Sequence, residues 1–224
     1  MSHSPRFLDF SNHFDALGFT AGFSLEGFST DGSDDRISLA DALRLPVSEL
    51  VIPKQTHSNH VQYCERGGDM DDTDGIIADK GTCVLSIQVA DCIPMFFIQK
   101  MTGRFGLVHA GWRGVEKGIA AEALAFFHPE EIFCLLGPSI QQCCFEIGPE
   151  VAAQFPESFQ KKGDGDRSFL NLQEAVINQL MEQGVPSHQI KNDGTCTACN
   201  RDDFHSYRRD GKKAGRHIAV AGWR

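Results

Sequence analysis

Apolar residues occur in short runs along the chain, and polar turns that contain glycine separate these runs. Several runs carry few polar positions, which is typical of strands covered on both faces. The pattern predicts strands over 50–53, 60–64, 83–89, 95–98, 104–108, 131–136 and 217–221. The strands between 83 and 108 follow one another closely, and we expect neighbouring ones to pair antiparallel.

Helical periodicity appears between these strands. Apolar positions at Val115, Ile119, Ala123 and Phe126 predict a helix over 115–127, and Asn171 precedes a second amphipathic stretch as its cap. Ser38 and Asp41 resemble a capping box that opens a short helix. Polar, glycine-containing stretches over 27–35 and 161–167 predict loops. Intermingled strands and helices favour an α+β (mixed α/β) fold, with mixed β-sheet layers flanked by helices in one domain over 1–224.

Length and composition agree with a globular protein. The chain has 224 residues, of which 41% are hydrophobic. A chain of this size buries roughly 70% of the surface that it exposes when unfolded, so it needs no disulfide to build a core. No apolar run reaches the ~18 residues that span a bilayer, and residues 1–10 lack the pattern of a signal peptide. We therefore expect a cytoplasmic protein without a membrane partner, whose eight cysteines are reduced thiols, metal ligands or nucleophiles.

Charge is unevenly distributed along the chain. The formal net charge of −9 argues against nucleic acid as a partner. Residues 201–224 nevertheless hold seven basic and three acidic side chains. This basic C-terminal stretch indicates either a site for a small anion or an ordinary solvated surface.

Three segments place a metal-ligating residue type at or just beyond a predicted strand end. They contain His57, Cys92 and His109. Two imidazoles and one thiolate form a ligand set that leaves a fourth position of zinc open, which is typical of catalytic sites. Histidines with ordinary core or surface roles are the alternative. Gly111 and Gly114 favour a ligand site, since glycine lets the backbone approach a ligand closely.

Five motifs occur in one order along the chain. They are Lys-Gln-Thr-His-Ser at 54–58, Ala-Asp-Cys-Ile-Pro at 90–94, His-Ala-Gly-Trp-Arg-Gly at 109–114, Gly-Pro-Ser-Ile at 137–140 with Cys-Phe-Glu-Ile at 144–147, and Ser-Tyr-Arg-Arg-Asp-Gly at 206–211 with Gly-Arg at 215–216. This series resembles the bacterial family known both as polyphenol oxidase (laccase-domain) proteins and as broad-specificity, zinc-dependent purine nucleoside phosphorylases. The likeness covers roughly residues 50–220.

The resemblance implies an activity and a ligand set. It implies a zinc enzyme that converts adenosine, inosine or guanosine and phosphate to the free base and ribose 1-phosphate. It also implies deamination of adenosine and use of methylthioadenosine. The family's zinc ligands fall on His57, Cys92 and His109. Residues 1–49 diverge from the family, since 19–24 lacks the arginine of its Phe-Thr-Thr-Arg segment, and His205 replaces the usual aromatic residue.

The two reactions call for further residues. Deamination needs a proton relay to the leaving ammonia, and Asp91 and Glu146 are the candidates; alternatively, Asp91 only orients its turn. Phosphorolysis needs cationic groups for phosphate, because guanidinium matches phosphate oxygens bidentately. The candidates for this role are Arg113, Arg208, Arg209 and Arg216, with Arg208 and Arg209 preferred. Nucleoside and phosphate are thus the expected partners of a chain that we take to be a monomer.

Three other interpretations stay open. Cys196 and Cys199 form a C-x-x-C that could be half of a structural zinc site or a redox pair, with Cys143 and Cys144 elsewhere in the chain. Cys92 and His109 could instead serve a cysteine-nucleophile hydrolase, including an amidase acting on peptidoglycan precursors. A copper-dependent polyphenol oxidase is the third, although the nine histidines include no His-x-His pair for a copper cluster. The single nitrogen and sulfur site could still take copper in vitro.

Overall fold

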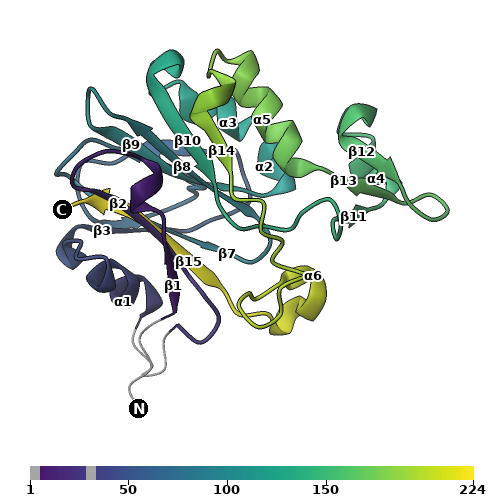
Figure 1. The fold of residues 1–224 in the computed structure, drawn as a ribbon, viewed down its shortest axis with the longest axis horizontal. Coiled ribbons are helices and arrows are strands. Elements are labelled where there is room, and N and C mark those ends of the chain that lie inside the picture. The colour runs from purple at the N-terminus through teal and green to yellow at the C-terminus, as the bar shows by residue number, and fades with distance from the viewer. Residues whose placement is uncertain (1–5, 29–33) are drawn as a thin grey trace.

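Most strands assemble into two six-stranded sheets that stack face to face (Figure 1). The computed structural model describes residues 6–28 and 34–224. Sheet 1 contains, in spatial order, β1 (Phe7–Asp9), β2 (Phe19–Ser24), β15 (His217–Trp223), β7 (Val84–Val89), β3 (Leu50–Pro53) and β5 (Gly68–Met70). Sheet 2 contains β14 (Ile190–Asn192), β10 (Ile132–Leu136), β8 (Ile93–Gln99), β9 (Arg104–Ala110), β6 (Gly75–Ala78) and β4 (Val61–Tyr63).

Both sheets mix parallel and antiparallel pairs. In sheet 1, β15 is antiparallel to β2 and β7, whereas β3 is parallel to β7 and β5. In sheet 2, β8 is antiparallel to β9 and β10, and β10 is parallel to β14. The predicted α+β fold with mixed sheets and flanking helices is confirmed.

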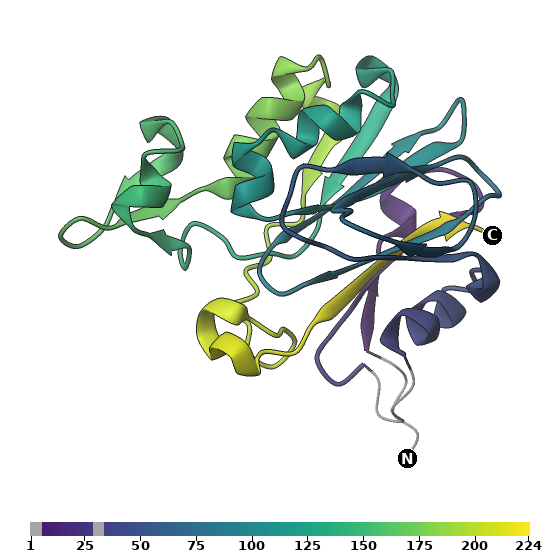
Figure 2. The same ribbon diagram turned by 180° about the vertical axis from the view of Figure 1, so that it is seen from behind.

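Helices cover the outer face of each sheet (Figures 1 and 2). Helix α1 (Asp35–Ala42) packs on sheet 1, while α2 (Trp112–Glu116), α3 (Ile119–Leu124) and α5 (Leu172–Glu182) pack on sheet 2. The pleat of β8 divides its side chains between two cores: Phe96 and Ile98 face sheet 1, whereas Met95 and Phe97 face the helices. No helix among the described residues is long and apolar enough to cross a membrane.

A smaller unit projects from one end of the sandwich (Figure 1). It consists of α4 (Pro149–Ala152) and a three-stranded sheet of β11 (Glu146–Ile147), β13 (Ser168–Leu170) and β12 (Gln160–Lys162). The last helix, α6 (Tyr207–Asp210), lies at the same end of the molecule.

Several local predictions need correction. The helix expected over 115–127 is broken into α2 and α3, because Gly118 adopts a left-handed conformation with φ of +79°. Helix α1 starts at Asp35, and the side chain of Asp34 caps it by accepting from the Arg36 N–H, so the capping box predicted at Ser38 is wrong. The Asn171 cap is confirmed by its bond from the Glu174 N–H. Of the loop predicted over 27–35, residues 29–33 lie outside the described part of the chain.

The strands between 83 and 108 do not form one meander. Strands β8 and β9 pair antiparallel as expected, but β7 belongs to the other sheet. The chain therefore passes from sheet 1 to sheet 2 between β7 and β8. It makes the same passage between β3 and β4 and between β5 and β6. These three crossovers, over 54–60, 71–74 and 90–92, position the candidate site.

Candidate metal centre

The predicted trio of His57, Cys92 and His109 is brought together by the crossovers. His57 lies in the passage from β3 to β4, Cys92 in the passage from β7 to β8, and His109 near the end of β9. One potential ligand atom from each lies within 4.8 Å of the other two. The two imidazole rings meet edge to face, with centroids 4.7 Å apart.

The carboxylate of Asp74 positions two members of this trio, His57 and His109. It lies in the second crossover, over 71–74, with 0% of its surface exposed. Its Oδ1 accepts from His109 Nδ1 at 2.8 Å and from the His57 N–H at 3.1 Å. Its Oδ2 accepts from the N–H and the hydroxyl of Ser58, both at 2.7 Å. A carboxylate on Nδ1 leaves Nε2 of His109 as the nitrogen available to a cation.

Sequence reasoning missed Asp74. The available signal is a carboxylate placed directly before the apolar strand β6, in Asp-Thr-Asp-Gly at 72–75. Burial would raise the pKa of Asp74, but the hydrogen bonds from His109 and Ser58 outweigh burial and hold it well below the usual range. Asp74 is therefore a fixed negative charge beneath the site.

The thiol and the imidazoles adjust each other's protonation. Burial would raise the pKa of Cys92, but the positive charge and hydrogen bonds of His109 and His57 outweigh it and lower the pKa to about 6. Burial would likewise lower the pKa of His109, yet Cys92 and Asp74 raise it to about 9. Cys92 therefore has the thiolate character that a metal ligand or a nucleophile requires.

Backbone conformation also marks the site. His57 and Asp91 adopt left-handed conformations, with φ of 60° and 81°. Such residues cost of order 1–3 kcal/mol each, so the surrounding contacts must hold them in place. The bonds of Asp74 to the His57 backbone do so in the first crossover.

A cation fits the space between the three side chains. A Cβ added to Gly111 would lie 3.1 Å from Cys92 Sγ and 3.2 Å from His57 Cδ2. Glycine at this position therefore keeps the pocket between the ligands open. The donor set of two imidazoles and a thiolate suits zinc and other borderline-soft ions. Within residues 6–28 and 34–224, no three histidines lie close enough to share an ion, as a copper cluster would require.

The trio lies in a cleft of about 750 Å³, within the size range of small-molecule sites. Aromatic and aliphatic side chains form its apolar walls: Trp112, Phe145, Tyr207, Ile140 and Leu172. Such walls offer flat surfaces against which a planar ligand can stack.

Three of the four predicted arginines line the cleft, namely Arg113, Arg208 and Arg216. The guanidinium of Arg113 lies 4.4 Å from the centroid of the Trp112 ring, and that of Arg208 lies 5.6 Å from the Phe145 ring. All three side chains are exposed and accessible to an anion from solvent.

Arg209 does not line the cleft. Its guanidinium donates to the carboxylate of Asp210, to the Phe204 carbonyl and to the carbonyls of Thr197 and Ala198. These bonds hold together residues 197–210, which we call the C-terminal arm. The Arg209 guanidinium is therefore not free to bind a ligand.

The two predicted carboxylates differ in position. Asp91 borders the cleft but is only 8% exposed, and its oxygens accept from Thr197 Oγ1 at 2.6 Å, Ser206 Oγ at 3.0 Å and the Arg208 N–H at 2.6 Å. It thus anchors the C-terminal arm beside Cys92. Glu146 lies on β11 outside the cleft lining, 3.9 Å from Arg167.

Gln55 is a second residue that sequence reasoning missed. Its side chain donates to the Gln88 carbonyl at 2.8 Å and accepts from the Gln88 N–H at 2.7 Å. This reciprocal pair joins the first crossover to β7. A glutamine two residues before the candidate ligand His57 is the corresponding signal in the sequence.

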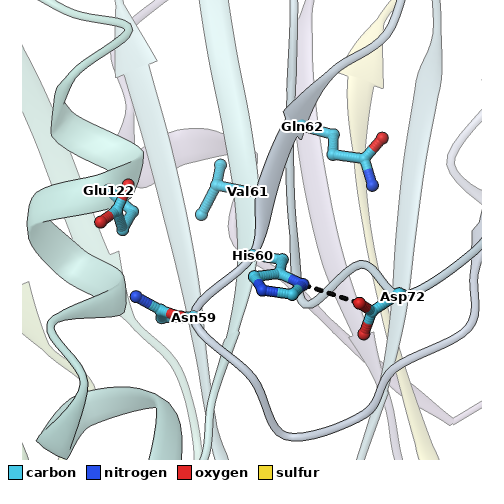
Figure 3. Close-up of a pocket in the computed structure, with 6 residues that line it drawn as sticks. All are labelled: Asn59, His60, Val61, Gln62, Asp72 and Glu122. Atoms are coloured by element: carbon cyan, nitrogen blue, oxygen red, sulfur yellow. Dashed lines mark hydrogen bonds and ion pairs between the residues drawn. The ribbon is translucent and has the colours of Figure 1, made fainter.

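The outer side of the first crossover carries a separate shallow pocket (Figure 3). His60 Nδ1 lies 2.8 Å from Asp72 Oδ2, and the two side chains point toward each other there. Asp72 also accepts from Thr56 Oγ1 at 2.6 Å. This pair braces the crossover from outside and contributes no atom to the trio.

Comparison with known proteins identifies the family. A family model described as multi-copper polyphenol oxidoreductase laccase matches residues 18–224. The chain belongs to this family. The resemblance drawn from the five motifs is thereby confirmed.

Curated relatives of this laccase-like family carry nucleoside-related names. Purine nucleoside phosphorylase YlmD of Geobacillus stearothermophilus is 31% identical over 87% of this chain and 80% of its own length. Adenosine deaminase RL5, from an unknown prokaryotic organism, is 30% identical over 82% of this chain and 78% of its own.

Solved structures share the whole fold. A hypothetical protein YfiH from Bacillus licheniformis superposes with a TM-score of 0.88 at 25% identity, covering 99% of this chain and 97% of its own. YlmD of G. stearothermophilus superposes with a TM-score of 0.85 at 28% identity, covering 93% of each chain.

Proposed function

We propose that the protein is a zinc-dependent purine nucleoside phosphorylase that also deaminates adenosine. The substrates of the first reaction are adenosine, inosine, guanosine and methylthioadenosine. The observation that carries the proposal is that one cleft contains the two-histidine, one-cysteine trio, an aromatic wall and three exposed arginines. The names of the relatives support the same substrate class.

His57, Cys92 and His109 would hold the zinc. When bound, zinc supplies a Lewis acid that polarises an oxygen of water or phosphate. Asp74 fixes the His109 ring through Nδ1, which would leave Nε2 for the ion, and its bonds to the first crossover hold the His57 backbone in position. The chain thus presents its ligands in a prearranged geometry, which lowers the cost of ordering the site.

The substrate groups would divide between two kinds of wall. A purine ring stacks favourably on aromatic side chains, and Trp112, Phe145 and Tyr207 offer such faces. Arg113, Arg208 and Arg216 would bind phosphate beneath the ribose, where a phosphate oxygen bonds to C1′ as the bond to the purine nitrogen breaks and the base takes up a proton. The positive charges of these arginines would also offset the negative charge of phosphate in the transition state.

Asp91 is assigned a positioning role in this proposal. Its carboxylate fixes the Arg208 backbone through the Arg208 N–H. Glu146 and Arg209 have no part in it, because neither lines the cleft.

The test is incubation of the zinc-loaded protein with adenosine, with and without phosphate, followed by chromatography of the products. We expect inosine in both mixtures, and adenine, hypoxanthine and ribose 1-phosphate only when phosphate is present. His57→Ala should abolish both reactions together with zinc binding by the trio in the cleft. His60→Ala is the matched control, because His60 lies three positions away on the outer side of the same crossover. Full turnover in His57→Ala would contradict the assignment.

A second function has one specific observation in its favour. Cys92, His109 and Asp74 follow one another as in the thiol–imidazole–carboxylate triads of cysteine hydrolases. His57, whose ring also hydrogen-bonds to the Cys92 thiol, has no role in such a triad, which is why we prefer the metal. A covalent acyl adduct on Cys92, with activity that resists chelators, would support the hydrolase. Activity that is lost to a chelator and restored by zinc supports the phosphorylase.

A further inference from the structure

Four cysteines meet outside the trio, and the proposed reaction does not use them. Cys143 and Cys144 lie in the connection from β10 to β11, and Cys196 and Cys199 lie in the connection from β14 to α6. One sulfur from each lies within 4.8 Å of the other three. We call this group the cysteine cluster.

The spacing within the cysteine cluster suits a single ion. Cys143 Sγ lies 3.8 Å from Cys144 Sγ and 3.6 Å from Cys199 Sγ, and Cys144 Sγ lies 3.3 Å from Cys199 Sγ. Zinc bonded to four sulfurs at ~2.3 Å in a tetrahedron separates neighbouring sulfurs by about 3.8 Å. Small adjustments of Cys143 and Cys199, the two exposed members, would bring the sulfurs to these separations.

The backbone around the cysteine cluster is already organised. Ser139 and Cys196 form a parallel bridge, in which the Ser139 N–H donates to the Thr195 carbonyl and the Thr197 N–H donates to the Ser139 carbonyl. The N–H groups of Gln141 and Cys199 donate to Cys196 Sγ. Backbone donors of this kind stabilise a thiolate, so the two connections are held in register before any ion arrives.

We propose that the cysteine cluster is a second zinc site, closed by four thiolates and distinct from the trio in the cleft. Four thiols bind one Zn²⁺ and release four protons, which leaves a centre with a net charge of minus two. The Arg209 guanidinium lies beside this centre, with Nη1 3.4 Å from the Thr197 carbonyl and 3.5 Å from the Ala198 carbonyl in the C-x-x-C turn. The bonds that keep Arg209 out of the cleft thus hold its guanidinium at the C-x-x-C turn, where it also pairs with Asp210.

The second zinc also fixes one wall of the cleft. Cys144 directly precedes Phe145, which lines the cleft, and Cys196 directly precedes Thr197, whose hydroxyl binds Asp91. Asp91 in turn holds the backbone of Arg208, and the Arg208 guanidinium lies over the Phe145 ring. One ion would therefore join the two connections that carry Phe145 and Arg208.

Metal content of the full chain, purified under reducing conditions with zinc in the growth medium, tests the proposal. We expect two zinc ions per chain in the unaltered protein, one for each group. Cys199→Ser and His57→Ala should each retain one, and the double variant none. Cobalt-loaded His57→Ala should show the intense thiolate-to-cobalt charge-transfer bands of a four-sulfur site, and the double variant should lose them.

Two results would overturn the second zinc site. One is a single zinc in the unaltered chain that His57→Ala removes and Cys199→Ser leaves in place. The other is a disulfide among the four cysteines in the freshly reduced protein, found by mass spectrometry of the unmodified chain. The count in His57→Ala does not depend on the trio, so failure of the phosphorylase proposal would still leave one zinc in that variant. Stepwise zinc release on titration of thiols with a mercurial gives the same count without any variant.

Discussion

At the scale of single residues, the role of His109 depends on the carboxylate beneath it. A histidine binds a metal through one nitrogen while the other is held by a hydrogen bond, and here Asp74 holds Nδ1 at 2.8 Å. The same carboxylate accepts backbone N–H groups of the first crossover. The buried side chain of Asp74 thus sets the orientation of the His109 ring and also holds the strained backbone of His57.

Replacement of Asp74 tests this double role. Asp74→Asn cannot accept at both oxygens, so we expect zinc affinity in the cleft to fall about 10–100-fold. Competition with a chromogenic chelator measures the affinity. Asp72→Asn is the matched control, since Asp72 lies two positions away, holds His60 on the outer side of the crossover and should leave the affinity within about twofold of normal. Equal effects of the two substitutions would contradict the assignment to Asp74.

Gly111 gives a second prediction. Its φ of −77° suits any residue, so Gly111→Ala should leave the unfolding free energy of the metal-free protein within about 1 kcal/mol of normal. The added methyl would press on Cys92 and His57, so zinc should bind at least about tenfold more weakly. Chelator competition and urea unfolding in EDTA measure the two quantities. Normal zinc affinity with normal stability would show that the cleft does not need the space.

At the scale of elements, strand β15 carries a pH-sensitive residue. His217 is fully buried at its start, where Nδ1 donates to the Ser24 carbonyl at 2.8 Å and Nε2 accepts from the His205 N–H at 2.7 Å. Burial and then the charge of His205 lower the pKa of His217 to about 4. The folded state therefore keeps this ring neutral where an unfolded chain would protonate it.

The pH dependence of stability follows from that difference. Above about pH 6.5 the ring is neutral in both states; as the pH falls from there toward 4, only the unfolded chain takes up the proton. His217 should therefore remove up to about 3 kcal/mol of stability across this window. His217→Asn keeps one donor and one acceptor, and its stability should fall less steeply over the same range. Urea unfolding in EDTA from neutral to acid pH measures both slopes, and parallel curves would refute the claim.

Elements were predicted where local pattern decides them. The apolar runs at β7, β8, β9, β10 and β15 and the Asn171 cap are visible in the sequence, because burial on both faces and capping leave local signals. The break at Gly118 was missed because the periodicity continues across it. The assignment of β7 and β8 to different sheets depends on long-range packing, which the three-residue connection over 90–92 does not encode.

At the scale of the whole molecule, a cluster of cations lies on an acidic protein. The net charge is −9, yet three exposed arginines line one cleft. We expect the KM for phosphate to rise severalfold between about 0.05 M and about 0.5 M salt, because salt screens these charges. The KM for uncharged adenosine should change by less than about twofold. Initial rates at a series of salt concentrations test this, and equal changes in both constants would argue against an electrostatic site.

The site was only partly visible from the sequence. His57, Cys92 and His109 stand out because histidine and cysteine at strand ends signal metal chemistry, and the structure places them together. Asp74 and Gln55 were missed, since an acid or an amide in a loop gives no distinctive signal. Arg209 and Glu146 carried suitable chemistry but point to other partners, which only the folded arrangement shows.

The three crossovers mean that the ligands do not share one rigid support. His57 and Cys92 lie on segments that leave sheet 1, whereas His109 belongs to sheet 2. The distances among the ligand atoms therefore depend on how the two layers are aligned, and that alignment is maintained by interior side chains such as Leu85 and Phe96, neither of which lines the cleft. A change of volume deep between the layers would shift one ligand against the others by fractions of an ångström. Substitutions in the interior can thus alter the affinity for the ion without touching it. Sequence changes in the core can therefore change the activity of the site.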